Sequence, residues 1–283
     1  MSETSCQPLQ IIEAQTVTDG AGVQLQRSLG LPEREDFDPF LLLDEIRSDR
    51  PADYIEGFPP HPHRGFQTIT IMRHGGFRHR DSLGNEGAIG SGGVQWMKAG
   101  GGIVHEEMPA PEEGRLWGYQ LWFNLPAAHK MDAPEWRDIP AADIPQLPLE
   151  GGGRLRLIAG RFRDHEGPLD KAGQELFLTD VSLPAGARLD LPLGHTRHHA
   201  LLHVGEGRLQ LDDGTILRTG QLALFRHCPR LAGTALEDAM LLIAAARPIG
   251  EPIARGGPFV MNYPQELRQA VEDWRTGRMG QIA

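Results

Sequence analysis

Short stretches in which apolar and polar residues alternate, separated by turn signals, run along most of this chain. Apolar and polar residues alternate in the stretch 66–72, which also carries β-branched residues. The stretches 94–97 and 118–125 are likewise typical of strands. A period of two residues is typical of strands with one buried face. Glycine (35 residues) and proline (22 residues) are frequent between the runs and favour many short strands over long helices. The pattern predicts an all-β fold.

The second half of the chain repeats the rhythm of the first. A histidine-rich phrase at 195–199 is followed by strand, glycine turn and strand, as the phrase at 61–63 is. Such doubling indicates two similar small β-barrels in tandem. We expect one barrel in residues 1–135, a second in residues 150–283, and a proline-rich linker at 136–149 between them.

One segment near the end has a helical pattern. Pro264 favours a helix start, and Gly277 favours its end. Leu267, Val271 and Trp274 form an apolar stripe at helical spacing. We expect a short C-terminal helix that packs on a barrel as the tail of the second domain.

Charge and composition narrow the classes of function. The net charge is -10, and the basic residues are scattered, so we expect no direct contact with nucleic acid. The first ten residues lack the features of a signal peptide, and the longest apolar run, 240–246, is too short to span a membrane. Cys6 and Cys228 leave a disulfide open, but so low a count favours a reducing compartment. We expect a cytoplasmic protein.

Two short phrases carry the candidate chemistry. His61 and His63 stand two residues apart, and so do His105 and Glu107. Residues two apart in a strand point to the same face, so two neighbouring strands would aim three imidazoles and one carboxylate at one centre. Because such a set leaves coordination positions open, it favours a mononuclear redox metal over a closed structural zinc site. We expect Fe(II), with Ni, Cu, Mn, Co and Zn as alternatives.

Ordinary roles compete with this interpretation. An isolated His-x-His phrase is often one exposed and one hydrogen-bonded histidine. The matching phrase at His105 and Glu107 is what favours a role of His61 and His63 as metal ligands. Glu106 should face away from the site and be solvated. For His74 and His79 the default is a surface position, with a supporting contact to a metal ligand as the alternative.

The histidines of the second half, His195, His198, His199 and His203, lack a His-x-Glu partner. His227 and Cys228 are weak substitutes. We therefore expect no metal in the second barrel.

Several phrases in a fixed order extend the picture, at 38–45, 61–66, 79–85, 93–97, 99–108, 120–125 and 257–262. Through these phrases the chain resembles the pirin family of the cupin superfamily. The resemblance implies two cupin (jelly-roll type) β-barrels, with iron only in the first. It also implies that His61, His63, His105 and Glu107 are the ligands.

The resemblance implies two kinds of function. Some bacterial members open the flavonol quercetin with dioxygen, and this is our leading hypothesis, with Glu107 as the catalytic base and a small aromatic substrate. The alternative is a non-enzymatic, iron-binding regulatory protein that modulates a transcription factor or a metabolic enzyme through protein–protein contacts. A structural, storage-type bicupin is disfavoured because it would need no buried ligand set.

Two further expectations concern the surroundings of the site. The family usually has Glu where this chain has Gln67. This change should leave the site intact but alter a charge or a hydrogen bond near it. Phe66, Ile71, Trp96 and Met97 are candidates to line an aromatic pocket, although core packing is their default role.

Overall fold

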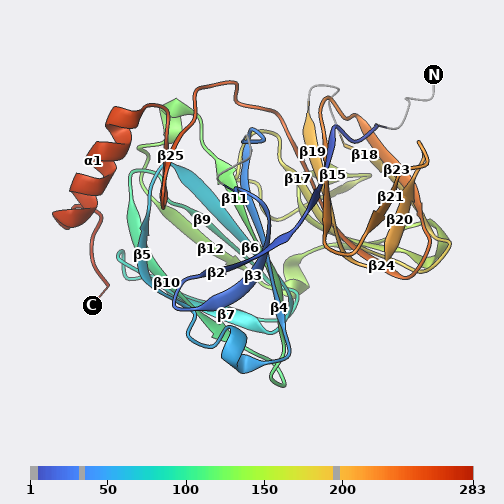
Figure 1. The fold of residues 1–283 in the computed structure, drawn as a ribbon, viewed down its shortest axis with the longest axis horizontal. Helices are drawn as coiled ribbons and strands as arrows, with labels where there is room; N and C mark the ends of the chain where they lie inside the picture. The colour runs from blue at the N-terminus through green and yellow to red at the C-terminus, as the bar shows by residue number, and fades with distance from the viewer. Residues whose placement is uncertain (1–5, 32–35, 194–197, 283) are drawn as a thin grey trace. The chain divides into compact units, whose positions relative to one another are not determined.

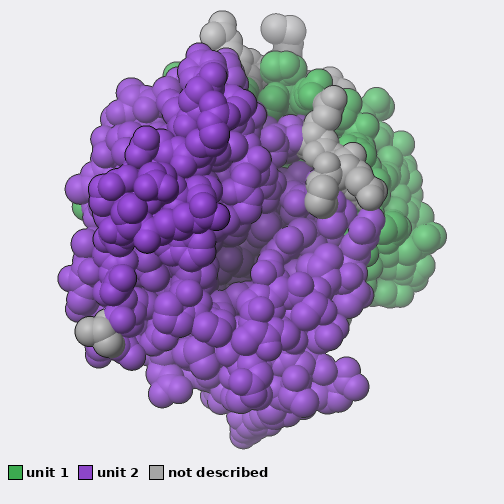
Figure 2. All heavy atoms as spheres, turned by 60° about the vertical axis from the view of Figure 1, so that its left-hand side comes forward, with its two compact units in different colours: residues 1–14, 142–248 green, residues 15–141, 249–283 purple. Residues whose placement is uncertain are grey.

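The computed structural model describes residues 6–31, 36–193 and 198–282 and divides the chain into two compact units. Unit 1 consists of Met1–Ala14 and Ala142–Pro248, and unit 2 of Gln15–Ala141 and Ile249–Ala283 (Figure 2). This division differs from the expected one, because each unit is completed by a terminal segment from the other end of the chain. The expected linker at 136–149 contains most of strand β12 and all of strand β13.

Unit 2 is built from two main antiparallel sheets and a small one. The seven-stranded sheet has the order β12-β9-β6-β11-β4-β3-β2, the four-stranded sheet β5-β10-β7-β8, and the small sheet β25-β26. Their bounds are β2 Gln15–Asp19, β3 Val23–Leu29, β4 Phe40–Ser48, β5 Phe58–His63, β6 Phe66–His74, β7 Gly76–Asp81, β8 Glu86–Ile89, β9 Val94–Lys98, β10 Ile103–Ala110, β11 Leu116–Asn124, β12 Glu135–Ile139, β25 Ala254–Gly256 and β26 Phe259–Met261.

Unit 1 repeats this plan. Its seven-stranded sheet has the order β1-β22-β19-β24-β17-β14-β13, its four-stranded sheet β18-β23-β20-β21, and its small sheet β15-β16. Their bounds are β1 Gln10–Glu13, β13 Gln146–Pro148, β14 Arg154–Ala159, β15 Arg161–Phe162, β16 His165–Glu166, β17 Phe177–Leu183, β18 Arg188–Pro192, β19 His199–Glu206, β20 Arg208–Leu211, β21 Ile216–Arg218, β22 Gln221–Phe225, β23 Arg230–Ala235 and β24 Ala239–Ala246.

The all-β prediction with two similar barrels is therefore confirmed, and so is the short helix α1 (Pro264–Arg275) near the C-terminus (Figure 1). Short 3-10 turns complete the described elements: η1 Pro51–Asp53, η2 Ala127–His129, η3 Ala141–Asp143 and η4 Glu150–Gly152. None of the helices in the described ranges is long and apolar enough to cross a membrane.

Both interiors combine apolar clusters with buried polar side chains. Unit 1 contains a large apolar cluster, in which Leu157 and Ile243 are fully buried, and it also buries His203. Unit 2 has apolar clusters of its own and buries His63 and His105. Because burying polar groups costs free energy unless they are paired, the partners of each buried histidine decide whether it serves packing or a site.

The C-terminal segment belongs to unit 2, not to the second domain as expected. The backbone N–H of Val260 donates to the carbonyl of Arg64 at 3.0 Å. Gly65 allows this close approach: its φ is +86°, and a Cβ there would collide with the Val260 carbonyl oxygen. Lys130 is buried below the same junction and donates to the carbonyl oxygens of Gly65 (2.7 Å) and Val260 (3.0 Å).

Helix α1 packs on the outside of the sheet that contains β10 (Figure 1). Its residues Leu267, Ala270 and Val271 join Val104 in one apolar cluster. The spacing predicted that Trp274 belongs to the same apolar stripe. Its side chain is instead 45% exposed and lies outside the packed cluster. The helix therefore docks through Leu267, Ala270 and Val271, and the packed face does not continue to its C-terminal end.

Cys6 and Cys228 form a disulfide within unit 1. The bond joins the segment before β1 to the connection between β22 and β23. It answers the question that the sequence left open. The sequence could not show that the two cysteines meet, because they are 222 positions apart.

A buried ion pair anchors α1. Arg64 donates to Asp273 at 2.7 Å and, through Nε, to the carbonyl of Gly101 at 2.7 Å. Burial opposes ionisation of Asp273, but hydrogen bonds from Arg64, Gln269 and Arg278 outweigh it and lower the pKa to about 2. A carboxyl group whose pKa is depressed by folding stabilises the native state above its unfolded pKa and loses that effect as pH falls.

We predict that Asp273→Asn lowers the free energy of unfolding at neutral pH by about 2 kcal/mol or more, since charge-assisted hydrogen bonds are lost. The deficit relative to the unmodified protein should shrink as pH falls from about 4 to about 2, where Asp273 itself becomes protonated. Urea unfolding over a pH series measures both. Glu272→Gln, a matched change at an exposed site on the same helix, should have little effect. A deficit that does not depend on pH would contradict the role assigned to the ion pair.

Candidate metal centre

Strand register sets the candidate site. Strand β5 lies at the edge of its sheet, where its prolines remove no hydrogen bond that a central strand would need. It pairs with β10 so that His61 lies directly opposite His105. His63 follows His61 by two residues and therefore shares its face. The antiparallel pairing thus places three imidazoles on one side of the sheet.

The three histidines form a compact cluster. Their candidate ligand nitrogens all lie within 4.8 Å of one another. The ring centroids of His61 and His105 are 4.3 Å apart, and those of His63 and His105 are 4.9 Å apart. His63 and His105 are only 3% and 1% exposed. The structure therefore brings together three of the four predicted ligands.

Hydrogen bonds leave one nitrogen of each ring available. Nδ1 of His61 lies 2.8 Å from the Pro59 carbonyl oxygen, and Nδ1 of His63 lies 3.3 Å from that of Pro258. Because a carbonyl only accepts, each Nδ1 carries the proton and each Nε2 keeps its lone pair. Nε2 of His105 is buried and has no hydrogen-bond partner. A buried, unpartnered nitrogen among two other bare nitrogens fits a metal ion that takes imidazole ligands.

The electrostatics of the cluster agree with this fit. Burial, and next the neighbouring His61, lower the pKa of His63 well below its usual 6.5. Burial together with the nearby His61, His63 and His79 does the same to the pKa of His105. Both rings are therefore neutral at neutral pH, which is the state that binds metal.

Glu107 lies on the same buried face but has partners of its own. It is 2% exposed, and its carboxylate accepts hydrogen bonds from Thr70 at 3.3 Å and from Gln120 at 2.9 Å. The pairing of β10 with β5 shifts register between His105 and Glu107. The described cluster within 4.8 Å consists of the three histidines without Glu107. Its role as a fourth ligand remains a prediction.

Glu106 points to the opposite face, as expected from the alternation. It is not simply solvated, because Arg80 forms an ion pair with it at 3.3 Å and its side chain is only 18% exposed. It takes no part in the histidine cluster.

The surface position assumed for His79 is wrong. His79 is 1% exposed, and its ring stacks on Trp136 with 5.2 Å between centroids. Nδ1 of His79 lies 3.5 Å from Nδ1 of His105, and Nε2 lies 3.2 Å from Asp81. One signal in the sequence could have revealed this position: Phe77, His79 and Asp81 alternate with arginines, as the inner face of a strand does. His74 is half-buried at the end of β6.

Gln67 and the aromatic candidates belong to the core. Gln67 is fully buried and accepts a 2.7 Å hydrogen bond from the indole N–H of Trp96, so a neutral side chain is accommodated there. Phe66, Ile71 and Met97 are also buried, at 0–1% exposure. These residues do not line the cavity beside His61 and His63, so their default packing role applies.

A cavity of about 570 Å³ opens onto His61 and His63. Figure 2 shows that unit 2 is hollowed on the face turned to the viewer. The lining is both apolar and charged: Asp19, Gly20, Leu25, Arg27, Leu42, Asp44, Ile46, Phe58, Pro59, Pro60, Gln120, Trp122, Arg255, Gly257 and Pro258 join the two histidines. Pockets for small organic ligands have this size and mixture.

Two arginines shape the wall of the cavity. Arg27 forms a two-pronged hydrogen bond with Asp44 at 2.7 and 2.8 Å. Arg255 lies over the ring of Trp122 at 5.4 Å and donates to the carbonyl of Leu41 at 2.8 Å. The arginines are thus held in place by partners within unit 2 before any ligand binds.

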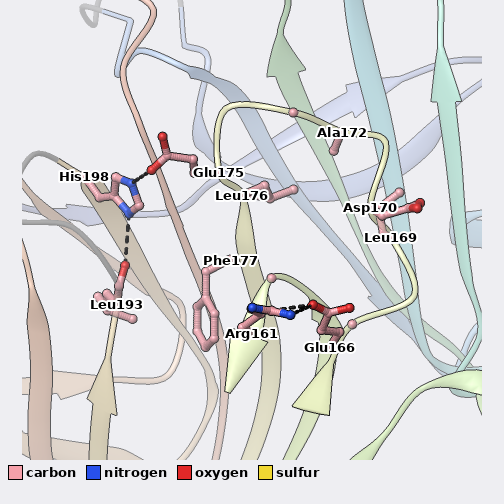
Figure 3. A pocket seen from close by; sticks show the side chains of 13 residues that line it. Arg161, Glu166, Leu169, Asp170, Ala172, Glu175, Leu176, Phe177, Leu193 and His198 are labelled. Atoms are coloured by element: carbon pink, nitrogen blue, oxygen red, sulfur yellow. Dashed lines mark hydrogen bonds and ion pairs between the residues drawn. The ribbon is translucent and has the colours of Figure 1, made fainter. Parts of the chain in front are cut away.

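A cavity of about 560 Å³ in unit 1 has a different character (Figure 3). His198 lies at its edge with both ring nitrogens engaged, by the Leu193 carbonyl at 3.0 Å and by Glu175 at 2.9 Å. His199 contacts the ring of His227, and Cys228 is in the disulfide and so offers no thiolate. His195 lies outside the described residues. The described part of unit 1 shows no cluster of potential ligands like that of unit 2.

Comparison with known proteins agrees with this architecture. A "Pirin-like protein" of Caulobacter vibrioides is 44% identical over 95% of this chain and 98% of its own. A Pseudomonas aeruginosa protein, named as a candidate quercetin 2,3-dioxygenase, is 43% identical over 95% of this chain and 96% of its own. The crystal structure of a quercetin 2,3-dioxygenase from Acinetobacter baumannii superimposes with a TM-score of 0.90 at 33% identity, covering 99% of this chain and all of that one.

The family match covers both barrels. Residues 22–123 match the Pirin family, and residues 178–280 match the Pirin C-terminal cupin domain. The two barrels are therefore cupin domains, and the chain belongs to the pirin family.

Proposed function

We propose that this protein is a metal-dependent dioxygenase that opens quercetin-type flavonols, with Fe(II) held by His61, His63 and His105 and by Glu107 as a fourth ligand. The observation that carries the proposal is the bare, buried Nε2 of His105 beside His61 and His63, two histidines that line a cavity large enough for an aromatic substrate. The quercetin 2,3-dioxygenase of Acinetobacter baumannii, similar over the full length, supports the substrate class. The metal would supply a redox centre at which a substrate oxygen and dioxygen meet.

The chain's own residues would orient the substrate. Phe58, Leu25 and Leu42 offer apolar walls to a flat aromatic ring, and Arg27 and Arg255 offer N–H groups to its hydroxyls. Because both arginines are already held by partners, little ordering would be needed on binding. Holding the substrate beside the histidine cluster is mainly a proximity effect.

Glu107 would act as the base that takes the proton of the substrate's hydroxyl. Oε2 is engaged by the amide of Gln120 at 2.9 Å, and Oε1 only by the longer Thr70 contact at 3.3 Å. Oε1 is therefore the oxygen that we expect to receive the proton. Gln120 and Thr70 would keep the carboxylate oriented meanwhile.

The ligand assignment is tested by metal content. We predict that His105→Ala removes about one equivalent of bound metal, because one of three clustered nitrogens is lost. The matched change His199→Ala, on β19 of unit 1, should leave the content unchanged. Elemental analysis after loading with Fe(II) without oxygen gives the stoichiometry. Full loading of His105→Ala, or loss from His199→Ala, would refute the assignment.

The role of Glu107 is tested separately. Glu107→Gln keeps the size of the side chain but cannot take a proton, so at saturating Fe(II) we predict a turnover number lowered by about 100-fold or more. Turnover should be measured on protein whose iron content has been verified, so that loss of metal is not mistaken for loss of the base. An unchanged rate at full loading would show that another group takes the proton.

The activity itself is tested by dioxygen uptake. Protein reconstituted with Fe(II) should consume dioxygen in step with quercetin loss, and His105→Ala should do neither. His199→Ala should behave as the unmodified protein does. Absence of uptake despite full iron loading would overturn the proposal and favour the iron-binding regulatory alternative.

A further inference from the structure

Behind His105, on the side away from His61, lies a second buried pair of titratable side chains, His79 and Asp81. Both are on β7, which pairs with β10 so that Asp81 is opposite His105 and His79 is opposite Glu107. They are 1% and 4% exposed. Nδ1 of His105, Nδ1 of His79, Nε2 of His79 and the Asp81 carboxylate thus form one continuous row of hydrogen-bonding atoms, with spacings of 3.5 Å and 3.2 Å across the two links.

The direction of this row is fixed at its Asp81 end. Oδ1 of Asp81 accepts from the backbone N–H groups of Leu83 at 2.9 Å and Asn85 at 3.1 Å, and Oδ2 accepts from the side-chain amide of Asn85 at 2.7 Å. A carboxylate surrounded by donors can only accept, so Nε2 of His79 must carry a proton.

The remaining protons then follow one from another. In the tautomer of His79 that donates through Nε2, Nδ1 is bare and accepts. Nδ1 of His105 must therefore carry the proton that it donates to His79. Nε2 of His105 is left bare, and this is the buried atom without a hydrogen-bond partner beside His61 and His63.

We propose that Asp81 and His79 are positioning residues that hold His105 in the tautomer able to bind the metal; the inference rests on the proposed metal site. His105 differs in this from the other two ligands. His61 and His63 have their tautomers set by backbone carbonyls, which no side-chain change removes. The tautomer of His105 is set by two side chains, so a single substitution at a distance reverses it.

Asp81→Asn is the decisive substitution. The two backbone N–H groups that point at Oδ1 keep the new amide oxygen there, so the new NH2 group faces His79 and the Asn85 side chain, whose amide turns its oxygen to accept. His79 must then accept at Nε2 and carry its proton on Nδ1, which it donates to Nδ1 of His105. The proton of His105 moves to Nε2 and points into the histidine cluster, where it blocks coordination.

The tautomer is read directly in metal-free protein by ¹⁵N NMR of labelled histidine. We expect a bare Nε2 on His105 in the unmodified protein and a bare Nδ1 in Asp81→Asn. Binding of Co(II), titrated by its visible absorption, should weaken by about 10- to 100-fold in the variant. Asn85→Ala is the matched control: it removes a hydrogen bond to the same carboxylate but leaves Asp81 an acceptor, so tautomer and affinity should stay unchanged.

Either of two results overturns the inference: a bare Nδ1 on His105 in the unmodified protein, or an unchanged tautomer in folded Asp81→Asn. The first needs no variant, so the test stands even if the substitution impairs folding. Neither result depends on turnover. A failure here therefore leaves the dioxygenase proposal standing, and absence of dioxygen uptake would leave the tautomer result standing.

Discussion

The site of this protein depends on the pairing of β10 between β5 and β7. In that register His105 is opposite His61 on one side and Asp81 on the other, and every second residue of the three strands faces inward. A slip by one residue would turn the entire set outward. Because His63 and His105 are buried, their pKa values are lowered and their imidazoles remain neutral, and a neutral imidazole is both a hydrogen-bond donor and a lone-pair ligand. The register of these three strands therefore determines which side chains meet at the site.

The C-terminal segment completes the first barrel. Pro258 supplies the carbonyl that orients His63, and Arg255 supplies part of the cavity wall. The segment is held by backbone pairing at Arg64, by the buried Lys130 and by the Arg64–Asp273 ion pair. Residues nearly 200 positions apart in the chain therefore cooperate in one ligand's orientation. The two barrels share a strand plan, and among the described residues the cluster of three histidines lies in unit 2.

The sequence was sufficient for features that depend on local periodicity. Alternation predicted the strands, and the i, i+2 spacing brought out His61, His63 and His105 because register places both phrases on one face. It was insufficient where long-range packing decides. No local pattern shows that Leu267 and Val271 pack against Val104 or that Cys6 pairs with Cys228.

His79 is the instructive omission, since its alternation with Arg78 and Arg80 was visible. What the sequence could not show is that its ring touches His105. The partners of Glu107, Thr70 and Gln120, were likewise unpredictable because they come from the opposite sheet.

The central claim is that one metal ion is bound by the Nε2 atoms of three histidines whose Nδ1 atoms face outward to fixed partners. Anomalous diffraction from crystals loaded with Fe(II) tests it most directly. We predict a single peak about 2.1 Å from Nε2 of His61, His63 and His105. A peak elsewhere in the chain, or coordination through the Nδ1 atom of any of the three, would contradict it.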